Sequence, residues 1–140
     1  MTPEDIINKA NELKTKYKTT NAITIAQELG IRVITRNVNP KVFKAHIVQF
    51  DNYPAFISIN SSFSELSQRV LCAHELGHAL LHQDCCINHF NTAADMVKQK
   101  MEYEANLFAV ALLFDENDFI CSFADMNNYM LKETLDINIY

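Results

Sequence analysis

Three residues that can act together on a metal ion lie in the segment His74-Glu75-Leu76-Gly77-His78. On a helix, residues four apart share a face and lie about 6 Å apart along the axis, so His74 and His78 can direct ring nitrogens at one zinc ion. Glu75 lies to the side of that ion, where its carboxylate can accept a proton from an attacking water. The segment therefore predicts two metal ligands and the catalytic base of a zinc-dependent peptidase.

This HExxH pattern also arises by chance, in roughly one of several hundred chains of such length. The surrounding residues argue against chance, because they form a long and nearly all-round apolar helical pattern. These apolar positions are Leu66, Val70, Leu71, Ala73, Leu76, Ala79, Leu80 and Leu81. Imidazoles and carboxylates rarely lie on such a helix without a partner, and a metal ion supplies one.

A catalytic zinc ion needs a third protein ligand and an open position for water. His82 lies about 12 Å along the helix from His74, which is too far for both to bind one ion. Asp84 stands where another group of zinc proteases has its third histidine, but the residues around it match that group badly. The third ligand is therefore expected from a different element.

The downstream helix offers Glu102 and Glu104, which point about 200° apart, so that only one of them can face the metal. Glu102 shares a stripe with Ala105, Asn106 and Ala109, and these small side chains allow the two helices to approach closely. Glu104 has no such stripe and is expected to be solvated or paired with a cation. We therefore predict Glu102 as the third ligand, with Asn106 hydrogen-bonded to a ligand histidine.

Two helices are expected at the start of the chain. The first covers about 3–16, because Thr2 can cap its N-terminus and Pro3 fits its first turn. The second covers about 22–29 and ends at Gly30, the residue type that best adopts the left-handed conformation at a helix end.

Short segments rich in Val, Ile and Phe then predict three strands, over about 31–36, 43–50 and 55–59. Turn residues separate the last two, which we expect to form a hairpin. Pro54 is compatible with the third segment if it lies near the start of an edge strand.

The helix that carries the HExxH pattern is expected to end near His82, and the spacing of Ser62 and Glu65 is that of a capping box at its start. A polar stretch over about 83–96 predicts a loop or irregular segment, and apolar residues over about 101–114 predict the second ligand-bearing helix. The last 20 residues mix apolar and polar types and predict one or two short helices.

Composition restricts the class of protein. A chain of 140 residues, 49% of them hydrophobic, is expected to form one domain over 1–140, with a core over about 20–115 and a tail over about 120–140. The net charge of −5 and the absence of a basic patch argue against direct nucleic-acid binding. No apolar run is long enough for a membrane span, and no secretory signal follows Met1, so a cytoplasmic protein is expected.

Several residues with reactive side chains have less specific surroundings. The four cysteines are expected to be reduced thiols, because a chain of this size does not depend on disulfides. Cys85 and Cys86 are adjacent, which is not the usual spacing of a structural zinc site, although His82 and His89 flank them. His46 could stabilise an oxyanion if the hairpin borders the cleft, as could the nearby Tyr53.

Three segments together resemble the ImmA/IrrE family of small metallopeptidases. They are Phe56-Ile57-Ser58-Ile59-Asn60, the run from Val70 to His82 that contains AHELGHALLH, and Glu102-Tyr103-Glu104-Ala105-Asn106-Leu107-Phe108-Ala109. The resemblance covers roughly residues 20–115. It does not extend to Leu113-Phe114-Asp115, where the family often has Leu-Met-Pro.

The resemblance implies a minimal α+β zincin-like domain, with a three-stranded sheet packed on the HExxH helix. It implies that His74, His78 and Glu102 hold Zn²⁺ and that Glu75 is the base, although Mn²⁺ or another divalent ion also suits such a donor set. It further implies a protein substrate, a helix-turn-helix repressor of a mobile element or stress regulon, whose cleavage derepresses transcription.

Two other functions remain open from the sequence. The protein could be an antirepressor-like module that sequesters a repressor and uses zinc only to fold, or the toxin of a toxin–antitoxin pair. Glu75 favours hydrolysis, because a structural zinc ion needs no base. An extended substrate segment is expected to pair with an exposed sheet edge.

Overall fold

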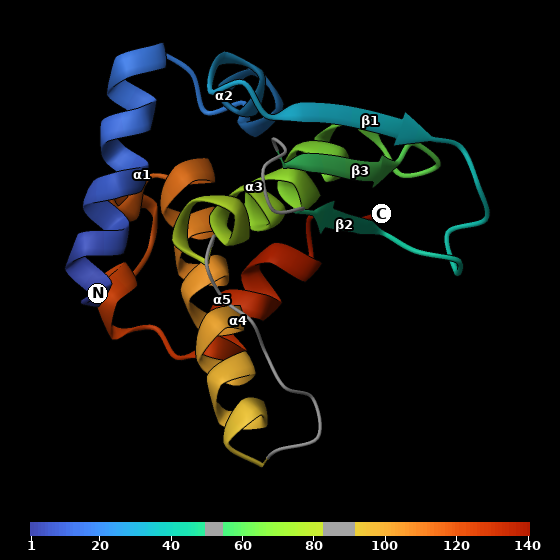
Figure 1. The fold of residues 1–140 in the computed structure, drawn as a ribbon. Coiled ribbons are helices and arrows are strands. Elements are labelled where there is room, and N and C mark those ends of the chain that lie inside the picture. Colours follow the sequence, from blue (N-terminus) through green and yellow to red (C-terminus); the bar gives the residue numbers. More distant parts are fainter. Residues whose placement is uncertain (50–54, 83–91) are drawn as a thin grey trace.

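The computed structural model describes residues 1–49, 55–82 and 92–140. The described elements are α1 (Pro3–Tyr17), α2 (Ala22–Glu28), β1 (Arg32–Arg36), β2 (Ala45–Val48), β3 (Phe56–Asn60), α3 (Glu65–Leu81), α4 (Thr92–Leu113), the 3₁₀ turns η1 (Glu116–Asp118) and η2 (Phe123–Asp125), and α5 (Asn128–Asp136). Figure 1 shows their arrangement. This order confirms the predicted α+β class with a three-stranded sheet.

The two N-terminal helices begin and end as their sequence signals predict. The hydroxyl of Thr2 accepts a hydrogen bond from the backbone of Asp5, whose carboxylate accepts one from the backbone of Thr2 in return. Gly30 adopts a φ of 80°, and the next backbone N–H, that of Ile31, donates to the carbonyl of Ala26. These are the bonds of a capping box and of a Schellman-type helix end.

The strands are ordered β1-β3-β2, with β1 parallel and β2 antiparallel to β3. The predicted hairpin of β2 and β3 is confirmed, but the expectation that the strand after Pro54 lies at an edge is wrong. β1 pairs along the edge of β3 that β2 leaves open, so β3 is the central strand. Pro54 itself lies outside the described residues.

The helix α3 begins later than the capping-box spacing predicted. Its N-cap is Ser64, whose hydroxyl accepts from the backbone of Ser67, and not Ser62. Ser62 instead donates its backbone N–H to the side chain of the buried Asn60. This bond holds Ser62 in a turn between β3 and α3.

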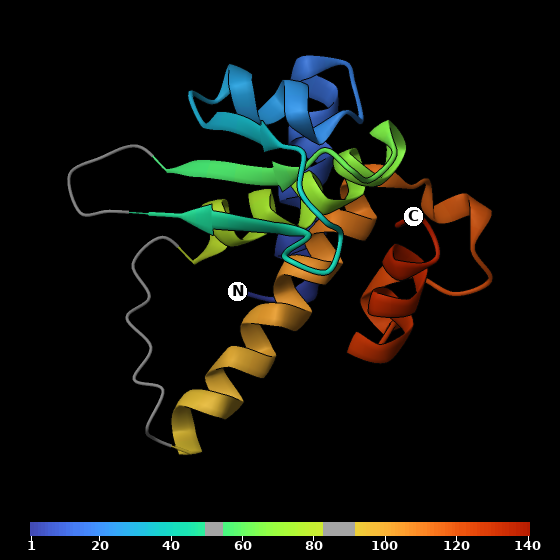
Figure 2. The same cartoon turned by 90° about the vertical axis from the view of Figure 1, so that its right-hand side faces the viewer.

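The helix α4 begins at Thr92, nine residues before the predicted start, so part of the segment expected to be irregular is helical. Residues 95–100 are exposed and extend past the core, as Figure 2 shows. They have no apolar face to signal a helix, but Met, Lys and Gln have high helix propensity. The rest of the expected loop, over 83–91, lies outside the described residues.

The helices form layers on one side of the sheet. α3 contacts β2 and β3 on one side and α4 on the other, while α1 and α5 pack against α4. The predicted short C-terminal helices are present as α5 and the two 3₁₀ turns. None of the described helices is long and apolar enough to cross a membrane.

The helices α3 and α4 approach each other closely at Gly77. A Cβ atom placed there would come within 3.1 Å of both Cα and the carbonyl oxygen of Ala105, and within 3.2 Å of the Phe108 ring. Two of these contacts involve helix backbone, which cannot move aside as a flexible side chain can. The absence of a side chain at Gly77 therefore fixes the spacing of the two helices.

Replacing this glycine tests how firmly the spacing is fixed. Helix propensity alone predicts that Gly77→Ala stabilises the protein by about 1 kcal/mol. Because overpacking costs about 1–3 kcal/mol, we expect a net loss of about 1 kcal/mol in the free energy of unfolding. Urea unfolding of the metal-free protein measures this change, and a gain in stability would contradict the packing argument.

Candidate metal centre

The structure brings His74, His78 and Glu102 together around one point. The Nε2 atoms of the two histidines lie 3.2 Å apart. One carboxylate oxygen of Glu102 lies 3.2 Å from His74 Nε2, and the other lies 3.0 Å from His78 Nε2. These are the only described residues whose ligand atoms form such a group, and Glu104 does not belong to it.

Helix geometry and helix packing explain this convergence. His74 and His78 are one turn apart on α3, and their rings meet edge to face with centroids 4.7 Å apart. Glu102 faces them from α4, one helical turn before Ala105, the residue that Gly77 contacts. The close packing of the helices at Gly77 therefore places the carboxylate within reach of both rings.

The three donors fit a zinc ion in type and in spacing. Two imidazole nitrogens and one carboxylate are a known catalytic ligand set that leaves a fourth position open. Zinc ligands at 2.0–2.1 Å in a tetrahedral arrangement lie about 3.3 Å from each other. The separations of 3.0–3.2 Å among Nε2 of His74, Nε2 of His78 and the Glu102 oxygens are close to that value.

The charges of the cluster are strongly coupled. Hydrogen bonds from His74 and His78 hold the pKa of Glu102 far below its ordinary value, so this group is a carboxylate. Burial acts to lower the pKa of His74, but the hydrogen bond to Glu102 and the charges of Glu75 and Glu102 outweigh it and raise the pKa. The cluster therefore attracts a cation, either a proton on His74 or a metal ion.

Glu75 lies beside the cluster and lines the same cavity as His74 and Glu102. Burial raises its pKa, and the charge of Glu102 adds to that effect, although the charges of His74 and His78 oppose it. A carboxylate with a raised pKa is a stronger proton acceptor than an exposed glutamate. Glu75 therefore lies beside the cluster, and its role as general base stays a prediction.

Asn106 connects the cluster to α5. Its side chain is buried, donates through Nδ2 to Asn128 Oδ1 at 2.8 Å, and contributes a hydrogen bond that raises the pKa of His74. Because only the oxygen of an asparagine amide can accept, Oδ1 of Asn106 is the atom available to a proton on His74. Asn128 was not singled out from the sequence, because nothing local links it to a helix 22 residues earlier.

His82 and Glu104 form a second pair beside the cluster. His82 Nε2 lies 3.2 Å from a carboxylate oxygen of Glu104, and its Nδ1 lies 3.0 Å from Nδ1 of His78. The side chains of His82 and Glu104 are only 7% and 13% exposed. Burial lowers the pKa of His82 more than the bond to Glu104 raises it. Glu104 lies outside the ligand cluster, as predicted, but it is neither solvated nor paired with a fixed cation, because its partner is an imidazole whose pKa is lowered.

A cavity of about 220 Å³ opens beside the cluster. The strand β2 and its preceding residue contribute Ala45 and Lys44 to its wall, and α5 contributes Lys132 and Asp136. Lys132 and Asp136 are joined by an ion pair of 2.6 Å. These residues were not predicted from the sequence, because the sequence indicated a C-terminal helix but not where that helix packs.

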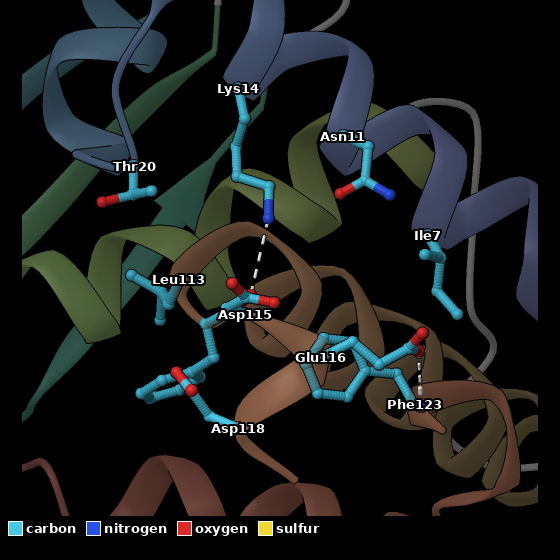
Figure 3. A pocket seen from close by; sticks show the side chains of 10 residues that line it. Ile7, Asn11, Lys14, Thr20, Leu113, Asp115, Glu116, Asp118 and Phe123 are labelled. Carbon is cyan, nitrogen blue, oxygen red and sulfur yellow. Dashed lines mark hydrogen bonds between the residues drawn. The ribbon is translucent and has the colours of Figure 1, made fainter. Parts of the chain in front are cut away.

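A larger cavity of about 660 Å³ lies between α1 and the segment after α4, as shown in Figure 3. Lys14 donates there to the carbonyl of Phe114, and Glu116 accepts from the backbone of Phe123. Burial lowers the pKa of Lys14 against the opposing charge of Asp115. None of the predicted metal or catalytic residues lines this cavity, so size alone does not identify the site.

The remaining candidates are placed as follows. His46 is exposed on β2, packs against Phe43 and is near enough to Glu75 to affect its pKa, but does not line the cavity. Cys72 and Cys121 are free thiols, and burial raises the pKa of Cys72 to about 12, so it is no nucleophile. Residues outside the described part of the chain are Tyr53, Asp84, Cys85, Cys86 and His89.

Comparisons with known proteins identify the family to which this chain belongs. The chain is 34% identical over 101 residues to "Uncharacterized immunity region protein 2" of Bacillus phage phi105, a match that covers 72% of this chain and 63% of the relative. No solved structure matches the chain. Residues 26–136, which include the three clustered side chains and Glu75, match the Peptidase_M78 model, described as the IrrE N-terminal-like domain. The chain therefore belongs to the ImmA/IrrE family of peptidases.

Proposed function

We propose that this protein is a zinc-dependent endopeptidase, with His74, His78 and Glu102 as ligands and Glu75 as the general base. The observation that carries the proposal is the convergence of two imidazoles and one carboxylate beside a cavity that Glu75 also lines. Zn²⁺ bound there would polarise the scissile carbonyl and activate water, and Mn²⁺ or another divalent ion suits the same donors.

The protein's own groups account for the movement of protons. Glu75 takes a proton from the attacking water, which its raised pKa favours, and then returns it to the leaving amine nitrogen. Asn106 would help to orient the ring of His74 through a hydrogen bond, while Nε2 of His74 faces Glu102. Asn128 in turn fixes the orientation of the Asn106 amide.

The cleft suits an extended polypeptide as substrate. β2 is an edge strand, and its Ala45, together with Lys44 just before it, lines the cavity that holds the cluster. A peptide that pairs with the free edge of β2 would pass close to His74 and Glu75. The edge therefore offers backbone hydrogen bonds that select for an unfolded or looped segment of a protein.

We propose a helix-turn-helix transcriptional repressor as that protein, cleaved in the cytoplasm to derepress its genes. The relative named for a phage immunity region supports a role of this kind. This chain spans 63% of the length of that relative.

The test incubates the zinc-loaded protein with the helix-turn-helix repressor encoded nearest to its own gene. We expect two fragments from the wild-type protein and a rate at least about 100-fold lower for Glu75→Gln, which keeps the ligands but removes the base. Electrophoresis and mass spectrometry follow the fragments, and zinc analysis confirms that both proteins are loaded.

The matched control is Glu65→Gln, the same change at an exposed position on the same helix, which should cleave at the wild-type rate. Cleavage that survives Glu75→Gln would contradict the assigned base. A stable complex without cleavage would indicate that the protein sequesters the repressor and is not a peptidase.

Zinc binding should also depend on pH in a specific way. A metal ion must displace the proton from His74, and the raised pKa of His74 means that this proton is held at a higher pH than in free histidine. Zinc affinity should therefore fall with decreasing pH, and the fall should begin above about pH 6.5. Competition with a chromogenic chelator between pH 8 and 5.5 measures it. An affinity that stays constant down to pH 6 would contradict the assignment of His74.

A further inference from the structure

We propose that His82 and Glu104 are positioning residues that hold the ring of His78 in the tautomer that binds a metal ion. The inference rests on the proposed metal site and extends it, since neither residue belongs to the ligand cluster. Its basis is a continuous chain of side chains that leads from Glu104 through His82 and His78 to the point shared by His74 and Glu102.

The chain has one contact at each step. Glu104 Oε1 lies 3.2 Å from His82 Nε2, and His82 Nδ1 lies 3.0 Å from His78 Nδ1. The opposite nitrogen of His78, Nε2, faces the carboxylate of Glu102 at 3.0 Å. Both nitrogens of His78 and both nitrogens of His82 are therefore engaged by a defined neighbour.

Hydrogen-bond chemistry fixes the direction of this chain. A carboxylate only accepts, so the proton between Glu104 and His82 lies on His82 Nε2. A neutral imidazole that donates through one nitrogen accepts through the other, so His82 Nδ1 accepts from Nδ1–H of His78. When a metal ion replaces the proton between His78 Nε2 and Glu102, the lone pair of His78 would be directed from Nε2 at the ion, and its remaining proton, on Nδ1, is the one that His82 accepts.

The reverse arrangement cannot bind the metal. If His82 carried protons on both nitrogens, it would donate to His78 Nδ1, and a neutral His78 would then hold its proton on Nε2. Glu104 is what favours the productive direction, because it takes up the Nε2–H of a neutral His82. This pair therefore acts on the metal only through His78.

The two ligand histidines are supported differently. His74 is held by an amide oxygen, that of Asn106, whereas His78 is linked through His82 to a carboxylate. The group that directly contacts Nδ1 of His78 is the imidazole of His82, and removing such a partner of a ligand histidine typically costs about 10–100-fold in metal affinity. His78 is therefore expected to bind the metal ion more weakly when His82 is replaced.

Burying His82 and Glu104 side by side costs free energy of desolvation. The side chains of His82 and Glu104 are 7% and 13% exposed, and two apolar residues could fill their space without the desolvation of a carboxylate. Every fully buried side-chain nitrogen and oxygen in the described part of the chain has a hydrogen-bond partner. For His82, the partner of Nε2 is Glu104 and the partner of Nδ1 is His78.

The test compares zinc affinities of three variants by chelator competition. His82→Leu fills the volume but cannot accept from His78, and we expect zinc affinity to fall about 10–100-fold. His82→Gln can accept from His78 and donate to Glu104, so it should recover most of that loss. The double variant His82→Leu/Glu104→Leu should bind zinc no more weakly than His82→Leu alone, because Glu104 acts through His82.

A spectroscopic measurement separates positioning from a purely structural role. In the zinc-loaded wild-type protein, the ring Nδ1–H of His78 should give a ¹H–¹⁵N signal that is protected from solvent exchange. The signal should be lost in His82→Leu and return in His82→Gln. Glu104→Gln still accepts a hydrogen bond and should keep the signal, with a smaller loss of zinc affinity. This variant replaces His82→Leu in the test if His82→Leu does not fold.

Two results would overturn the inference. The first is a zinc affinity of His82→Leu within about twofold of the wild type. The second is an equal loss in His82→Leu and His82→Gln, since a structural role would not distinguish them by their hydrogen bonding. Neither result depends on peptide cleavage, so the proposed peptidase activity stands or fails separately. A wild-type protein that binds no zinc would contradict the metal site itself.

Discussion

The close contact between α3 and α4 at Gly77 is the constraint on which the site depends. Ala105 of α4 occupies the space that a side chain at Gly77 would need. Because Glu102 is one turn before Ala105 on α4, this packing also sets its distance from His74 and His78 on α3. Helices held farther apart would leave the two histidines facing a cavity and the carboxylate out of reach.

Near this contact, burial and hydrogen bonding give three glutamates different surroundings. Glu102 accepts from two histidines and its pKa is strongly lowered, whereas burial raises the pKa of Glu75. Glu104, two residues from Glu102, faces the opposite way and pairs with His82. One helical turn thus carries two glutamates with different partners. In the proposed mechanism, these environments separate the ligand, the base and the group that positions a ligand.

Local patterns were sufficient to predict the elements that carry chemistry, and tertiary packing decided the rest. The periodicity of the HExxH helix and the stripe that contains Glu102 predicted which side chains converge, and the cluster has that composition. The start of α4 was missed because residues 95–100 are exposed and have no apolar period. Local patterns did not predict that β3 is the central strand or that α5 lines the cavity. Both features depend on contacts between segments that are distant in the sequence.

The central claim is that one metal ion is held jointly by α3 and α4. The most direct measurement is a crystal structure of the zinc-loaded protein with diffraction data collected on both sides of the zinc absorption edge. The account predicts a single anomalous peak about 2.0–2.2 Å from Nε2 of His74, Nε2 of His78 and a carboxylate oxygen of Glu102. A peak bound by His82 or Glu104, or no peak between these three residues in a zinc-containing crystal, would contradict it.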